Sequence, residues 1–147
     1  MSAAAQARLN SLRGQELSRL HATGTAPEPG ELDGVLDGTV LTPPVIGALA
    51  LWRGKSVTTS QGKTAGLNRI GLGPLELRRY HFTTRIGQSA FTGRAVLLLD
   101  HNLPANPFYI RRFHDELVRV DAGLYLATTH YLIKNRLRFV CYFALAQ

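Results

Sequence analysis

The chain is poor in cysteine, in acidic side chains and in long apolar runs. Its single cysteine, Cys141, cannot form an internal disulfide, and its apolar neighbours predict a buried, unreactive thiol. No apolar run approaches the roughly 20 residues that a membrane-spanning helix needs. Residues 1–8 lack the basic start and the apolar block of a secretory signal. We therefore expect a cytoplasmic protein without a membrane span.

Several short motifs that mark a cofactor or a catalytic group are also missing. The glycines form neither a Gly-x4-Gly-Lys-Ser/Thr phosphate loop nor a Gly-x-Gly-x-x-Gly fingerprint. A Gly-x-Ser-x-Gly elbow, which would mark a nucleophilic serine, does not occur. His101, His114 and His130 lack the close spacing of metal ligands, although a fold could bring them together. These absences predict that the protein uses no cofactor and no metal.

The shortage of acidic residues is uneven along the chain. Residues 1–50 carry three basic and five acidic side chains, whereas residues 51–147 carry fourteen basic and five acidic ones. Such an excess can mark a surface for nucleic acid or for an anionic ligand. Here the cations alternate with apolar positions instead of clustering, which favours scattered solvent-facing side chains and disfavours a nucleic-acid partner.

The N-terminal segment predicts one amphipathic helix over residues 3–22. Leu9, Leu12, Leu17 and Leu20 fall on one stripe, and Gly24 follows as a stop. This helix should pack outside the domain or against a second copy, so a homodimer is one expectation. Prolines at 27 and 29 mark a linker. We therefore divide the chain into a helix with its linker over residues 1–30 and a single barrel domain over residues 31–147.

The rest of the chain shows mainly strand patterns. Short runs over residues 31–41, 56–60, 64–70, 75–86, 94–100, 124–133 and 137–146 recur about every ten residues, with turns such as Gln61-Gly62 and Lys134-Asn135 between them. Residues 45–52 fit a strand or a short helix equally well. The spacing predicts a mainly β fold, an antiparallel barrel or strongly curved sheet.

One further helix is predicted over residues 107–121, before the last two strands. Asn106 can cap it and Pro107 suits its first position. Tyr109, Phe113 and Leu117 recur every four residues, and oppositely charged pairs such as Arg111 and Asp115 are spaced i, i+4.

Three sequence phrases carry a resemblance to a known family. The stretch from Leu99 to Ala127 contains Asp-Glu-Leu-x-Arg over residues 115–119 and Gly-Leu-Tyr-Leu-Ala over residues 123–127, and Trp-Arg-Gly-Lys occupies residues 52–55. This combination of phrases resembles bacterial lipocalin-like (calycin-type) small β-barrels, in which a glycine stands where this chain has Ala127. The resemblance implies a cup that holds a small hydrophobic molecule, and it implies no reaction.

The ligand-binding candidates are aromatic and basic residues expected near the cup. Aromatic side chains can form its walls and an arginine or lysine can anchor a carboxylate or carbonyl. The candidates are Trp52, Lys55, Arg79, Tyr80, Arg85, Arg94, Tyr125, Tyr131 and Phe139.

Acid–base chemistry in the cup is the alternative to simple binding, as in a cofactor-free isomerase or cyclase of a natural-product intermediate. The pairs Asp100-His101 and His114-Asp115 place carboxylates beside imidazoles, which can transfer protons in a dry site. The acid or base would be Asp100, His81, His114 or a tyrosine. A structural interpretation is favoured, in which Asp100 caps a turn at Asn102 and Asp115 pairs with an arginine. Whether the protein is an enzyme stays open on the sequence, as does the less favoured nucleic-acid barrel.

Overall fold

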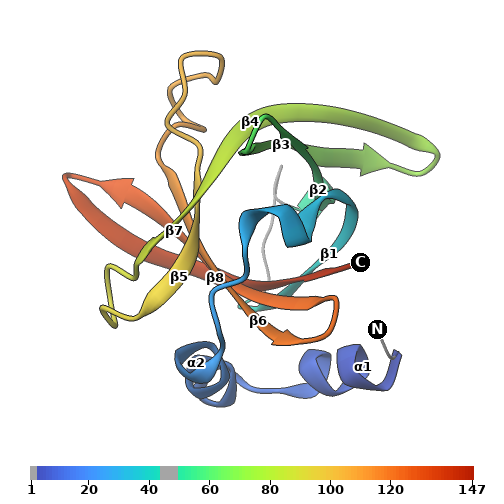
Figure 1. Ribbon diagram of the computed structural model, residues 1–147, viewed down its shortest axis with the longest axis vertical. Coiled ribbons are helices and arrows are strands. Elements are labelled where there is room, and N and C mark those ends of the chain that lie inside the picture. Colours follow the sequence, from blue (N-terminus) through green and yellow to red (C-terminus); the bar gives the residue numbers. More distant parts are fainter. Residues whose placement is uncertain (1–2, 44–49) are drawn as a thin grey trace.

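The protein folds into a closed antiparallel barrel of eight strands, each paired with its sequence neighbours (Figure 1). The structure, a computed structural model, describes residues 3–43 and 50–147. The strands are β1 (Gly34–Thr42), β2 (Trp52–Ser60), β3 (Lys63–Leu72), β4 (Leu75–Gln88), β5 (Ala95–Asp100), β6 (Phe113–Asp121), β7 (Leu124–Ile133) and β8 (Arg136–Ala146). The predicted mainly β antiparallel barrel is confirmed. Residues 45–49 of the ambiguous apolar stretch lie outside the described residues.

Tight turns set the register of two hairpins. Gln61 and Gly62 between β2 and β3, and Lys134 and Asn135 between β7 and β8, all have positive φ. Two successive residues with positive φ match the right-handed twist of the flanking strands, so such turns favour hairpins. Both predicted turns are confirmed.

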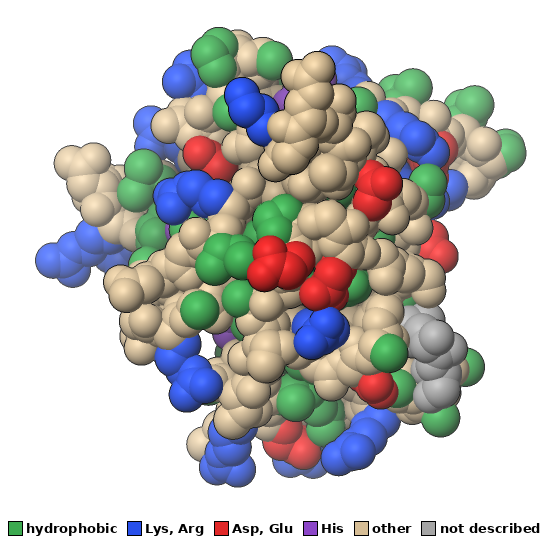
Figure 2. Space-filling model, in the orientation of Figure 1, with side chains coloured by type: hydrophobic (Ala, Val, Ile, Leu, Met, Phe, Trp, Pro, Cys, Tyr) green, Lys and Arg blue, Asp and Glu red, His purple; other side chains and the backbone are tan. Residues whose placement is uncertain are grey.

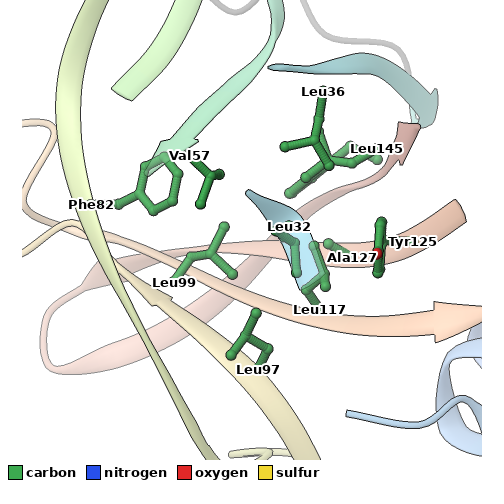
Figure 3. Packing of buried hydrophobic residues seen from close by; sticks show 11 residues of the cluster. Leu32, Leu36, Val57, Phe82, Leu97, Leu99, Leu117, Tyr125, Ala127 and Leu145 are labelled. Atoms are coloured by element: carbon green, nitrogen blue, oxygen red, sulfur yellow. The ribbon is translucent and has the colours of Figure 1, made fainter. Parts of the chain in front are cut away.

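One end of the barrel interior is filled by apolar side chains. Figure 3 shows residues of several strands converging there, with Leu32 from a short 3-10 helix, η1 (Pro29–Leu32), closing the end. Phe82, Leu97, Leu99 and Leu117 are fully buried in this cluster. Burying a side chain of this size stabilises a fold by about 1.5–3 kcal/mol. We call this packed end the closed end of the barrel and the opposite end, which contains a cavity, the open end.

The N-terminal segment lies on the outside of the barrel as two helices, α1 (Ala3–Ser11) and α2 (Gly14–Thr23), where one was predicted. Leu9 and Leu17 pack on an outer cluster that includes Val118 and Leu126. His21 of α2 also places its Nε2 2.9 Å from the Glu116 carbonyl oxygen. The predicted packing against the outside of the domain is confirmed. Among the described residues, no helix is long and apolar enough to cross a membrane.

The segment predicted as a helix over residues 107–121 is wrong for most of its length. Helix-like hydrogen bonds are confined to residues 107–113, where the amides of Ile110 and Arg111 donate to the Pro107 carbonyl and the Phe113 amide donates to the Ile110 carbonyl. Strand β6 begins at Phe113 and pairs with β5 and β7. In β6 the side chains alternate, so that Asp115 and Leu117 face inward while their neighbours face outward. Pairing with β5 and β7 therefore determines the conformation of this segment, although its sequence has a helical periodicity.

Candidate functional site

The end of the barrel opposite the packed core contains a cavity of about 570 Å³. Successive inward residues on each strand pass from cavity wall to core. On β6 this order is Phe113, Asp115 and then Leu117, and on β7 Thr129 lies next to Ala127. The lining is mostly apolar or aromatic, and it consists of Val40, Trp52, Lys55, Asn68, Ile70, Tyr80, His101, Tyr109, Ile110, Phe113, Asp115, Thr129, Tyr131, Ile133, Val140, Cys141 and Phe143. An apolar cavity with a few polar groups is the usual form of a small-molecule site.

Four polar side chains meet where the cavity gives way to the core, and we name them the floor quartet: Lys55, Asn68, His101 and Asp115. All four are buried, Lys55 with only 2% of its surface exposed. The Lys55 Nζ lies 3.5 Å from Asp115 Oδ2 and donates to Asn68 Oδ1 at 2.8 Å. Burial lowers the pKa of Lys55, and the nearby Asp115 opposes that effect. The Lys55 ammonium thus has one carboxylate and one amide oxygen as polar partners.

Asn68 holds the quartet together through both atoms of its amide. Its Oδ1 accepts from Lys55 Nζ and from Trp52 Nε1, the latter at 3.0 Å. Because both of these groups can only donate, the oxygen of the amide must face them. The Asn68 Nδ2 therefore donates, to the Tyr80 carbonyl at 2.9 Å and toward His101 Nε2 at 3.3 Å.

His101 is neutral in this site. Burial lowers its pKa to about 4, and the Asp115 carboxylate only partly offsets this effect. Since Asn68 donates to Nε2, the ring proton lies on Nδ1. Neither this Nδ1 nor Asp115 Oδ1 has a hydrogen-bond partner among the described residues. A buried polar atom without a hydrogen bond lowers the stability of a fold, so we expect these two atoms to bind a water molecule or a polar group of a ligand in the cavity.

Local backbone features place the walls of the site. The ring of Trp52 packs where a Cβ on Gly38 would overlap it, and it also meets Phe143 edge-on with centroids 4.9 Å apart. Tyr80 occupies a bulge in β4, with φ of 66°, where the register against β3 shifts. A bulge redirects a side chain, and Tyr80 lines the cavity.

Four of the predicted site residues line the cavity, namely Trp52, Lys55, Tyr80 and Tyr131. Arg79, Arg85 and Arg94 are exposed, and Arg79 lies over the Tyr80 ring. Tyr125 is buried in the core at the closed end, where its hydroxyl donates to Gln147 Oε1.

Phe139 lies outside the barrel, although its strand was predicted to carry it on the same face as Cys141 and Phe143. The register between β7 and β8 shifts so that Phe139 pairs with His130 while Cys141 pairs with Thr129. Val140 is the extra residue, and it lines the cavity instead. The Phe139 ring then lies 5.8 Å from the His130 ring.

The three residues proposed for acid–base work lie outside the cavity lining. Asp100 accepts from the Asn102 amide at 2.9 Å, as in the structural interpretation of this turn. His81 is exposed, and its backbone pairs with Asn106. His114 faces outward, with Nε2 2.8 Å from Glu116 Oε2.

The predicted pairing of Asp115 with an arginine is replaced by its pairing with Lys55. The members of the floor quartet that sequence reasoning left out of the site are Asn68, His101 and Asp115. Asp115 and His101 belong to the two acid–base pairs considered in the sequence, where a structural role was favoured for them. The register of β3, β5 and β6 brings them to Lys55. Among the described residues, no group of three or more His, Cys, Asp or Glu side chains is arranged to hold a metal ion.

Comparison with known proteins supports the fold and adds no function. No protein-family model matches this chain, and no curated protein matches it significantly. A crystal structure of a protein from Thermomonospora curvata is similar, with a TM-score of 0.59 over 92% of this chain and 88% of that chain. The two sequences are 15% identical, so the likeness concerns the fold alone.

Proposed function

We propose that this barrel binds a small, largely apolar molecule in its cavity, with one polar group of the ligand placed on the floor quartet. The carrying observation is an apolar cavity that ends on the buried floor quartet, in which His101 Nδ1 and Asp115 Oδ1 have no hydrogen-bond partner among the described residues. Lys55 can donate to a carbonyl or carboxylate, and Asp115 Oδ1 can accept from a hydroxyl. An up-and-down barrel of eight strands is also the lipocalin architecture, which supports the lipocalin-like assignment as part of this proposal.

Trp52 provides a direct test, because it is the single tryptophan and it lines the cavity. Purified protein is first examined by native mass spectrometry for a retained apolar molecule. Ligand-free protein is then titrated with an anilinonaphthalene sulfonate dye while Trp52 emission and thermal stability are followed. Saturable quenching and a raised melting temperature are expected. Ile133 lies on the cavity wall, so Ile133→Asp should lower the affinity for the dye. Ile86 is an exposed apolar residue at the closed end, so Ile86→Asp should leave that affinity unchanged. Equal effects of the two variants would contradict binding in the cavity.

A second candidate is cofactor-free proton transfer in the same cavity, favoured by the unpaired Asp115 Oδ1 beside Lys55. Asp115 would remove a proton from the carbon next to a ligand carbonyl, while the Lys55 ammonium donates a hydrogen bond to the carbonyl oxygen as it gains charge. Return of that proton to a different carbon completes an isomerisation with no net change in atoms or electrons. This assigns to Asp115 the role that the sequence offered to Asp100, His81 or His114.

Deuterium exchange separates catalysis from binding. Decalone, an apolar bicyclic ketone, is incubated with the protein in heavy water, and deuterium entry next to the carbonyl is followed by NMR. Exchange above the buffer rate is expected for the natural protein. It should be lost in Asp115→Asn while decalone still quenches Trp52. Exchange that persists in a folded Asp115→Asn protein would remove Asp115 from the mechanism.

A further inference from the structure

The hairpin between β3 and β4 projects from the open end of the barrel (Figure 1). It carries exposed leucines. Leu72, Leu75 and Leu77 are exposed by 72%, 74% and 60%. In register, Leu72 pairs with Leu75, and Ile70 pairs with Leu77. Since alternate residues of a strand share a face, these four side chains lie on one face of the hairpin. We name this set, Ile70, Leu72, Leu75 and Leu77, the leucine face.

The leucine face continues the wall of the cavity. Ile70 lines the cavity, and the remaining three side chains extend the same face beyond the barrel toward the hairpin tip. The opposite face of this hairpin is polar, because Arg69 pairs with Glu76 there at 2.9 Å. Exposed apolar surface of this kind typically marks an interaction site. Figure 2 shows hydrophobic side chains along this projecting part of the surface, with basic side chains close by.

Two other loops at the open end also carry exposed apolar side chains beside basic ones. The β5–β6 connection exposes Phe108 by 75%, and β7 ends at the exposed Ile133. The strand ends at the open end, residues 70–80, 100–113 and 131–138, carry seven cations and two acidic residues, so their net charge is 7 − 2 = +5. The cations are exposed and consist of Arg78, Arg79, Arg111, Arg112, Lys134, Arg136 and Arg138. Apolar tips ringed by cations complement an anionic surface with an apolar interior.

We propose that the open end docks on anionic phospholipid bilayers, with the leucine face and Phe108 entering the headgroup region and the surrounding cations contacting lipid phosphates. Charge complementarity selects this occupant. Basic residues near an anionic membrane are attracted to its lipid phosphates, and apolar side chains that enter the headgroup region strengthen the binding. A nucleic acid would use the cations and leave three leucines in water, and a second copy would bring the same positive charge against itself. Docking would place the cavity mouth at a source of apolar molecules.

Vesicle flotation tests this proposal with the full ligand-free chain. Binding is expected to vesicles of phosphatidylcholine with about 30% phosphatidylglycerol, not to phosphatidylcholine alone, and is expected to fall in about 0.5 M salt. Leu72→Asp with Leu75→Asp should reduce the bound fraction on the order of tenfold. The matched control is Val35→Asp with Ile86→Asp, two exposed apolar residues near the closed end. Lys134→Glu with Arg136→Glu should also release the protein, whereas Lys63→Glu with Arg94→Glu, at the closed end, should not.

Several outcomes would overturn the proposal. Absence of flotation with the anionic vesicles at low salt would do so, as would equal losses in the open-end and closed-end variants. A dimer in solution that Leu72→Asp dissociates would assign the leucine face to a second copy. Salt-sensitive binding of a single-stranded oligonucleotide, unchanged by the leucine substitutions and without vesicle binding, would assign the cations to nucleic acid.

Discussion

Lys55 on β2 and Asp115 on β6 form an ion pair with Nζ and Oδ2 3.5 Å apart, and both side chains are buried. Lys55 Nζ also lies 4.6 Å from the centre of the Phe82 ring and 5.6 Å from that of Phe143. These rings offer weak cation–π attraction and exclude water. Removing two charges from water costs several kcal/mol for each ion, and the attraction within the pair repays this only in part. The buried pair therefore lowers the stability of the fold, as is common for charged residues of a functional site.

Replacing one partner of this ion pair should lower the stability of the protein more than replacing both partners with apolar residues. We expect Lys55→Met or Asp115→Leu alone to lower the free energy of unfolding by about 3–5 kcal/mol, because each leaves an unpaired buried charge. The double variant should lose less than the sum of the two. Urea unfolding followed by circular dichroism measures all four proteins. Glu31→Gln is a control, because it breaks an exposed pair with Arg119 and should cost at most about 1 kcal/mol. Additive losses in the double variant would contradict the coupling.

His101 should make the protein less stable as the pH falls from about 6.5 to 4. Its pKa in the folded protein is lowered to about 4 by burial, whereas an exposed imidazole titrates near 6.5. Within this window the unfolded chain binds a proton that the folded chain does not, so the free energy of unfolding decreases with falling pH. The loss from His101 is on the order of 3 kcal/mol and is complete below pH 4.

His101→Gln should remove this part of the pH dependence. Burial also lowers the pKa values of His21 and His130, so the informative quantity is the difference between the natural protein and the variant. Urea titrations at several pH values between 7 and 4 measure it. Parallel curves for the two proteins would show that His101 is not the group responsible.

The sequence predicted the barrel well and the floor quartet poorly, for identifiable reasons. Period-two alternation and turn residues are local, so the turns at Gln61 and Asn135 could be predicted from neighbours alone. Strand β6 was predicted as a helix because Tyr109, Phe113 and Leu117 recur every four residues. The alternating pattern of its inward face is interrupted at Asp115, which belongs to the site. Phe139 was placed inside because an extra residue, Val140, is not visible in an alternating pattern. Functional residues are the ones expected to break local rules.

Glu116 should hold the loop between β4 and β5 against the barrel wall. Its Oε1 accepts from Ser89 Oγ at 2.6 Å and its Oε2 from the Ala90 amide at 2.8 Å. Burial alone would raise the pKa of Glu116, but the hydrogen bonds from His114, Ser89 and Ala90 outweigh it and hold the pKa at about 2. This contribution is therefore present above pH 4.5 and lost as the pH falls toward 2.

We expect Glu116→Gln to lower the free energy of unfolding by about 1–3 kcal/mol at pH 7 and to flatten its change below pH 4.5. Proteolytic cleavage within residues 89–94 should become faster in the variant. A cleavage rate equal to that of the natural protein would show that Glu116 does not restrain the loop.

Cys141 should react slowly with thiol reagents and report on occupancy of the cavity. It lines the cavity, and burial raises the pKa of its thiol to about 11. The reactive thiolate is therefore scarce at pH 8. A disulfide-exchange reagent should label the folded protein much more slowly than the urea-unfolded chain, and a bound dye should slow the labelling further. Labelling at the unfolded rate would place the thiol in open solvent.

Gly54 should be the least replaceable glycine near the site, whereas Gly14 should be free to change. The backbone of Gly54 has φ of 134°, which side chains disfavour, and a Cβ there would overlap the Leu36 carbonyl oxygen on β1. The bulge at this position lets Trp52 and Lys55 both face inward, since the register against β3 shifts between Trp52 and Gly54. Gly54→Ala should therefore lower the free energy of unfolding by about 2–4 kcal/mol, and it should weaken ligand binding by displacing Trp52 and Lys55.

At Gly14, the first residue of α2, a Cβ meets nothing within 4 Å, so Gly14→Ala should raise the free energy of unfolding by about 0.4–1 kcal/mol. Thermal unfolding and dye titration of the two variants measure both effects, and a Gly54→Ala protein with natural stability would contradict the role given to the bulge.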